Sequence, residues 1–140
     1  MSNKRVVITG LGAITPIGNT VDTFWNNAIN GVSGAKAITK FDTTKFKTKF
    51  ACEIQDFDPK IYLNHNEIKR TDLFTKYALH VAPEALADSG LELDKMNPFD
   101  IGVIWGSGQG GMTTFEEEME GYHGNDRTPR FSPFFIPKII

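Results

Sequence analysis

Residues 101–111 read IGVIWGSGQGG, an apolar run that passes directly into a turn rich in glycine. The β-branched and aromatic side chains of residues 101–105 favour a buried strand. After the turn, a helical pattern from about Met112 to Tyr122 places one apolar face toward a core, formed by Met112, Phe115, Met119 and Tyr122. The order strand, glycine turn, helix predicts one unit of a layered α/β fold.

The start of the chain repeats this order. Residues 5–9, RVVIT, predict a second buried strand, and Gly10-Leu11-Gly12 supplies the turn. Thr20 is a suitable N-cap for a helix from Val21 to about Asn30, which Gly31 would close.

The middle of the chain holds the longest predicted helix. It starts at Thr71, is kinked or restarted at Pro83, continues to Ser89 and is capped by Gly90. Before it, residues 31–49 predict a surface loop and residues 50–55 a strand. Residues 56–68 are expected to be irregular with one helical turn near Ile61, and residues 123–130 to form a polar loop.

Composition describes an ordinary soluble domain. The chain has 140 residues, of which 40% are hydrophobic and 23% charged, and its formal net charge is −2. This charge gives no global attraction for nucleic acid or anionic membrane, so neither is expected as a partner. The sequence shows no signal peptide and no apolar run of about 18 residues, so a cytoplasmic location without a transmembrane helix is expected.

The glycine run 106–111, GSGQGG, also matches the G-x-G-x-x-G pattern of dinucleotide-binding turns. That pattern requires an acidic residue about 20 positions later, at the end of a second strand. Here the corresponding region is a polar loop with Asp126. Close backbone approach at a strand-to-helix turn explains the glycines more simply.

Other chemistry-bearing residues form no self-sufficient catalytic group. The single cysteine, Cys52, lies within a predicted strand beside Glu53, so we interpret it as a packed structural residue. His65, His80 and His123 make no ligand motif, so no metal site is predicted. Two basic pairs, Lys69 with Arg70 and Arg127 with Arg130, are either solvated surface or, if they converge, a docking site for an acidic partner.

The last ten residues, FSPFFIPKII, are strongly apolar. If exposed, they would form a patch that favours association. Two interpretations stay open from the residues alone. The segment packs on the chain's own core, or it continues into further protein or crosses a subunit interface.

Six blocks in order resemble the β-ketoacyl-acyl-carrier-protein synthases, and the details are most similar to the type II elongating enzymes of bacterial fatty-acid synthesis. The blocks are KRVVITGLGAITPIGNT at 4–20, Phe41-Asp42, Lys49-Phe50-Ala51, Asp88-Ser89-Gly90-Leu91, Ile101-Gly102-Val103 with the glycine run 106–111, and SPFFIP at 132–137. Together they cover nearly the whole chain.

The resemblance implies a thiolase-like fold with αβαβα layers, of which residues 1–140 would be part of the first half. It implies a homodimer in the cytoplasm that elongates acyl chains by decarboxylative Claisen condensation with malonyl-acyl carrier protein, without a cofactor. The family's cysteine nucleophile and two histidines match no residue of this chain. The chain alone is therefore expected to be inactive, with no catalytic residue assigned.

The resemblance also implies non-catalytic roles. Gly108 and Gln109 fall where the family's glycine turn borders the acyl pocket, and Gln109 replaces a residue that is commonly hydrophobic. Phe134 and Phe135 match a segment that reaches the partner subunit and its acyl pocket. Carrier-protein docking is expected to involve four cations, Lys69, Arg70, Arg127 and Arg130, with Arg127 the least well aligned of them.

Two alternatives remain. One is a polyketide-type ketosynthase, or a chain-length factor without a nucleophile. The other is a non-catalytic module that binds carrier protein or dimerises.

Overall fold

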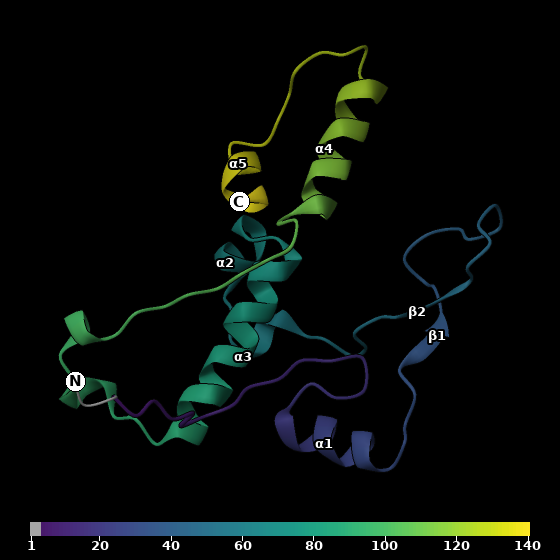
Figure 1. Ribbon diagram of the computed structural model, residues 1–140. Helices are drawn as coiled ribbons and strands as arrows, with labels where there is room; N and C mark the ends of the chain where they lie inside the picture. Colours follow the sequence, from purple (N-terminus) through teal and green to yellow (C-terminus); the bar gives the residue numbers. More distant parts are fainter. Residues whose placement is uncertain (1–3) are drawn as a thin grey trace. The chain divides into compact units, whose positions relative to one another are not determined.

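The computed structural model describes residues 4–140, and Figure 1 shows its helices and strands. These residues form two compact units. The first contains the described residues up to Asp58 together with Val81–Glu92, and the second contains Pro59–His80 and Leu93–Ile140. The helix α3, Leu73–Ser89, belongs to both units.

Helix α1, Val21–Ile29, lies in the first unit and begins as predicted. The hydroxyl oxygen of Thr20 accepts a hydrogen bond from the Thr23 amide at 3.2 Å, which satisfies one of the free N–H groups of the first turn. Gly31 follows the helix with a φ of 69°, a left-handed conformation that glycine adopts without steric cost. Local sequence signals therefore define both ends of α1.

Strands β1, Ala35–Ala37, and β2, Phe50–Cys52, pair antiparallel with Ala35 opposite Cys52. The prediction of a strand after residue 49 is confirmed, although the strand is shorter than expected. The prediction of a continuous loop over 31–49 is wrong at β1, because β2 supplies a hydrogen-bonding partner that the local sequence does not reveal. Cys52 is exposed rather than packed, so the interpretation of it as a packed structural residue is wrong.

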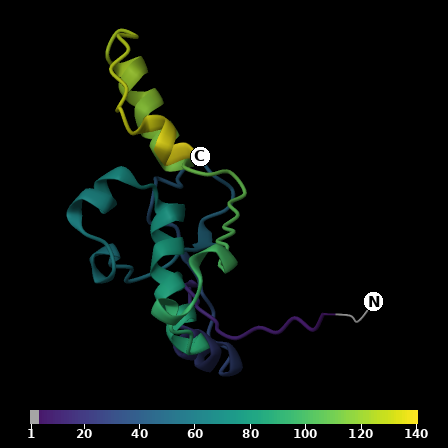
Figure 2. The ribbon, with the colours of Figure 1, turned by 90° about the vertical axis from the view of Figure 1, so that its left-hand side faces the viewer.

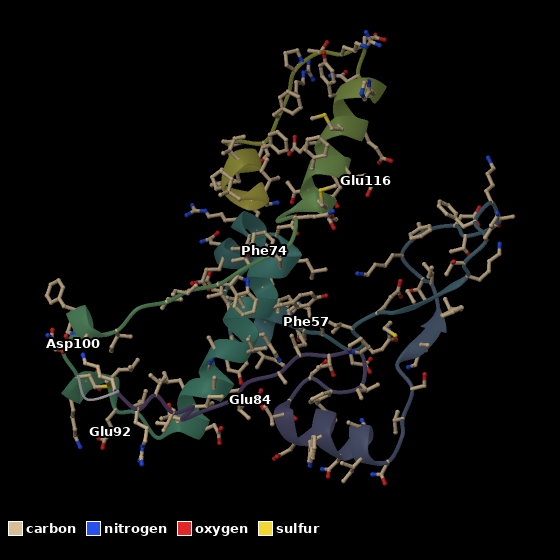
Figure 3. The ribbon with its side chains drawn as sticks, in the orientation of Figure 1. Phe57, Phe74, Glu84, Glu92, Asp100 and Glu116 are labelled. Carbon is tan, nitrogen blue, oxygen red and sulfur yellow. The ribbon has the colours of Figure 1, made fainter. Side chains whose placement is uncertain are left out.

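The glycine-rich opening segment lies against the second half of α3. Glu84 accepts hydrogen bonds from the Ala13 amide at 2.9 Å and the Val21 amide at 2.8 Å (Figure 3). Asp88, one turn later, accepts one from the Leu11 amide at 2.8 Å. A Cβ atom at Gly12 would overlap the Val81 carbonyl oxygen, so this approach requires glycine.

The two predicted buried strands are not formed. Residues 5–9 and 101–105 have no strand assignment, and Figure 2 shows the first of them as an extended trace without a strand beside it. Val6 and Val103 are each 91% exposed. The β-branched pattern sets an extended preference, but a buried strand needs neighbours for its backbone N–H and C=O groups, and the described residues offer these segments none.

The second unit is mainly helical. Three short 3₁₀ helices, η1 (Pro59–Ile61), η2 (Leu93–Lys95) and η3 (Pro98–Asp100), accompany α2 (His65–Arg70), the first half of α3, α4 (Met112–Gly124) and α5 (Phe135–Ile139). The prediction of a helical turn near Ile61 is confirmed, but α2 was not predicted. The sequence does contain a signal for α2, since Asn64 and Glu67 form a capping box at its N-terminus.

Helix α3 continues through Pro83, so of the two predicted effects of this proline, a kink or a restart, the restart does not occur. Helix α4 extends two residues beyond the predicted end at Tyr122. No helix among residues 4–140 is both long enough and apolar enough to cross a membrane.

Burial in this structure is mostly polar. Leu63, which is 8% exposed, is the only buried hydrophobic side chain among the described residues, and the buried polar side chains Asp72 and Thr114 are 6% and 5% exposed. The best-buried contact of the second unit is therefore a polar one, and it lies beside the glycine turn.

Candidate functional site

The glycine turn, residues 106–111, joins the extended segment 101–105 to α4. Gly110 has a φ of 67°, and its amide donates to the Ser107 hydroxyl oxygen at 3.1 Å. Gly108 has open space where a Cβ would lie. The exposed Gln109 makes no hydrogen bond within residues 4–140, so its amide is free to face whatever approaches the turn.

The end of the chain packs directly on this turn. The Gly111 amide donates to the Ile139 carbonyl oxygen at 3.3 Å. A Cβ atom at Gly110 would overlap the Ile139 carbonyl, and one at Gly111 would overlap that of Lys138. Close backbone approach thus requires glycine at positions 110 and 111, as predicted, whereas Gly106 and Gly108 meet no such contact.

Asp72 holds the start of α4 from the junction between α2 and α3. One oxygen of its carboxylate, Oδ2, accepts hydrogen bonds from the Thr114 amide at 3.0 Å and from the Thr114 hydroxyl. The other oxygen accepts from the Leu73 amide. All three donors are neutral groups in the first turns of α3 and α4. Hydrogen bonds from these two helix starts therefore stabilise the buried carboxylate.

The C-terminal phenylalanines contact two different elements. Phe135 stacks on Phe131 and Phe115, with ring centroids 5.5 Å and 6.2 Å apart. The guanidinium carbon of Arg70 lies 5.2 Å from the centroid of the Phe134 ring, within the range of a cation–π interaction. One predicted docking cation therefore touches one predicted acyl-pocket residue.

The four predicted docking cations form two separate pairs. Lys69 and Arg70 are the last residues of α2, close to the start of α4 through Asp72. Arg127 and Arg130 follow the other end of α4, whose 13 residues span about 20 Å (Figure 1). All four are exposed, so a single partner would have to span both ends of α4 to contact them together.

Hollows occur in both units. One, of about 260 Å³, lies between α4 and the segment that follows it and is lined by Glu117, Glu118, Gly121, Tyr122, Thr128, Arg130 and Phe131. A second, of about 390 Å³, lies in the first unit around the start of α1 and contains none of the predicted site residues. Arg130, one of the four predicted docking cations, thus borders a concave surface.

Residues outside the turn add little chemistry. The described part of the chain contains no group of three or more His, Cys, Asp or Glu side chains placed to hold a metal ion. His80 is half-buried, and its ring centroid lies 5.3 Å from that of Tyr62. Burial raises the pKa of the Tyr77 hydroxyl on α3.

Sequence reasoning missed Asp72 and Thr114, which are central to the site. Asp72 directly precedes the longest helix, a position where aspartate is a usual cap, so its local role could have been predicted. Its contact with Thr114, 42 residues away, has no sequence signal.

Nearly the whole chain matches one protein family. The family model described as "Beta-ketoacyl synthase, N-terminal domain" matches residues 3–139. The 3-oxoacyl-[acyl-carrier-protein] synthase 2 of Coxiella burnetii is 44% identical over 141 residues, which cover 100% of this chain and 34% of that protein. The protein of the same name from Staphylococcus aureus strain COL is 45% identical over 139 residues, 99% of this chain and 33% of that protein.

Solved structures of ketosynthases are also similar to this chain. The ishigamide ketosynthase/chain length factor aligns with a TM-score of 0.79 and 29% identity, over 96% of this chain and 33% of that chain. The AntDE ketosynthase, solved in complex with AntF, a type II polyketide synthase acyl-carrier protein, aligns with a TM-score of 0.78 and 27% identity over 99% of this chain and 35% of that chain. The chain spans about a third of the length of the curated relatives it matches.

Proposed function

This chain belongs to the β-ketoacyl synthase family as its N-terminal domain, and we propose that the protein it represents elongates acyl chains by decarboxylative Claisen condensation. The observation that supports this most strongly is the match over residues 3–139, together with 44% identity to a 3-oxoacyl-[acyl-carrier-protein] synthase 2. The fold class is accordingly the α/β, thiolase-like fold of the ketosynthases, present here in part.

In this proposal the residues of the chain bind and orient rather than react. No catalytic residue is assigned to the chain, and the 140 residues alone are inactive. The glycine turn with Gly108 and Gln109 borders the acyl chain, while Phe134 and Phe135 shape the same pocket near a second copy of the protein. The proposed setting is a cytoplasmic homodimer that requires no cofactor.

The apolar rings at the turn support this role physically. Phe135 stacks on Phe131 and on Phe115, which is four residues beyond the glycine turn, and an acyl chain is stabilised by about 0.8 kcal/mol for each buried methylene. Gln109 disfavours a long acyl chain, since an amide buried against methylenes without a hydrogen-bond partner is destabilising.

A direct test uses a chimera in which residues 4–140 of this chain replace the matching segment of the Coxiella burnetii enzyme. We expect the chimera to release carbon dioxide from malonyl-acyl carrier protein and to form 3-oxoacyl-carrier protein with an acyl primer. Mass spectrometry of the carrier protein detects the product. A folded chimera that transfers no acyl group, beside an active Coxiella enzyme, would contradict the proposal.

Carrier-protein docking is proposed at Lys69 and Arg70, with Arg127 and Arg130 as a second contact. The exposed cations match the acidic surface of a carrier protein, and one structural relative was solved in complex with such a protein. Docking of this kind weakens with salt because exposed charges are screened over roughly 10 Å at 0.1 M.

Charge reversal tests this docking site. In the chimera, Lys69→Glu with Arg70→Glu is expected to weaken carrier-protein binding about tenfold, equivalent to about 1.4 kcal/mol. Fluorescence anisotropy of labelled carrier protein measures the change. The control is Lys45→Glu with Lys47→Glu, which makes the same charge change at two exposed positions between β1 and β2. Equal losses in the two variants would show a general charge effect and no specific site.

The second candidate is a polyketide-type condensing enzyme, favoured by the two structural relatives described above. The reaction product distinguishes a fatty-acid synthase from a polyketide-type enzyme. A fatty-acid synthase accepts the acyl chain after its keto group has been reduced, whereas a polyketide enzyme also extends an unreduced β-keto chain.

A further inference from the structure

Asp72 and Thr114 form the most deeply buried polar pair of the described chain. The carboxylate of Asp72 receives three hydrogen bonds, two from Thr114 in the first turn of α4 and one from Leu73 in the first turn of α3. No cation pairs with this carboxylate within residues 4–140. Its partners are therefore two helix starts, which are thereby held at a fixed separation.

This pair lies next to the glycine turn. Gly111 is buried, and a Cβ atom there would come within 2.9 Å of the Asp72 carboxylate as well as overlapping the Lys138 carbonyl. Thr114 is three residues beyond Gly111, so fixing its amide fixes the point at which the turn enters α4. On its other side the turn is hydrogen-bonded to Ile139.

We propose that Asp72 is a positioning residue that fixes the glycine turn and thereby sets where the Gln109 amide meets the acyl chain. This inference rests on the proposed function. Asp72 touches no reacting atom, and it acts through Thr114 and the backbone of the turn. Its position in sequence, directly after Lys69-Arg70-Thr71, also joins the proposed docking cations to the proposed acyl pocket.

Only a carboxylate satisfies this geometry. Both oxygens of Asp72 face donors, whereas asparagine would present one oxygen and one N–H₂ group. In either orientation of that amide, an N–H₂ group would face an N–H or O–H donor. Asp72→Asn therefore removes at least one hydrogen bond with almost no change in side-chain volume, and we expect the turn to become mobile.

The test measures acyl-chain selectivity in the chimera. The quantity is the ratio of kcat/KM for tetradecanoyl-carrier protein to kcat/KM for hexanoyl-carrier protein. For Asp72→Asn we expect the ratio to rise about fivefold, because a mobile turn lets the Gln109 amide move away from the methylenes of the long chain. A ratio of rate constants does not depend on the folded fraction, so a loss of stability alone leaves it unchanged.

A matched control is Glu84→Gln. Glu84 also accepts two backbone hydrogen bonds that hold a glycine-rich segment, but it belongs to the first unit, whereas the proposed pocket residues belong to the second. We expect this variant to be less stable and to keep the original selectivity. An unchanged ratio for Asp72→Asn, or the same rise in both variants, would overturn the inference.

Two further experiments test the role of Asp72 if its variant does not fold or if the chimera is inactive. If Asp72→Asn does not fold, Thr114→Val removes only the hydroxyl bond and is expected to shift the ratio in the same direction, while Thr114→Ser keeps it. If the unsubstituted chimera is inactive, the proposed function fails, and amide hydrogen exchange tests the positioning alone. Asp72→Asn should then accelerate exchange at Thr114 and Gly110, and unchanged exchange there would reject the role of Asp72.

Discussion

Gly12→Ala in the chimera is expected to lower stability by about 3 kcal/mol, because the added methyl group overlaps the backbone of α3. The nearest atom would be the Val81 carbonyl oxygen, and the Ala85 amide nitrogen would lie 3.1 Å away. Neither belongs to a flexible side chain, so the opening segment itself must move. That movement would also stretch the hydrogen bond between Ala13 and Glu84. Thermal unfolding followed by circular dichroism measures the loss.

Gly121→Ala is the control for this substitution. Gly121 lies within α4, and a Cβ atom there would meet nothing within 4 Å. In a helix interior, alanine is more favourable than glycine by about 1 kcal/mol, so the control should match or exceed the parent in stability. If the two variants melted at the same temperature, the close packing of Gly12 on α3 would be refuted.

The 140-residue chain on its own is expected to bind a hydrophobic dye strongly and to melt without a cooperative transition. Cooperative unfolding requires a core, and Leu63 is the only buried hydrophobic side chain among the described residues. Val6, Val103 and Ile104 are 91%, 91% and 99% exposed, so large apolar surfaces face the solvent.

Dye fluorescence and scanning calorimetry measure these two properties, with the chimera as the folded reference. In the chimera we expect weak dye binding and a sharp transition, because further polypeptide covers the same surfaces. A single sharp transition and a monodisperse, monomeric state for the isolated chain would instead support the alternative of an independent binding module.

The helix predictions succeeded where the signal is local. Thr20 and Gly31 define α1, and Gly90 follows α3 with a φ of 65°. A cap or a left-handed glycine acts within a few residues, so its effect is visible in the sequence. The capping box of Asn64 and Glu67 is a local signal of the same kind for α2, although that helix was not predicted.

The strand predictions failed at residues 5–9 and 101–105 for a different reason. Their β-branched side chains favour an extended backbone, which they have, but strand formation depends on pairing with another segment. At Ala35–Ala37, by contrast, a strand formed in a predicted loop because Phe50–Cys52 pairs with it. In both cases the deciding partner lies outside the local window.

The features of the candidate site also separate into those that a local stretch of sequence reveals and those that depend on distant contacts. The sequence by itself determined the family, the glycine turn at 106–111, and the cations and phenylalanines to which roles are proposed, because each of these is a local pattern of residue types. Only the tertiary structure decided that α5 packs on that turn, that Arg70 meets Phe134, and that Asp72 holds Thr114. Such contacts join residues 42 or more positions apart in two of these cases, and nothing in a local stretch of sequence specifies which distant donor a buried carboxylate will meet.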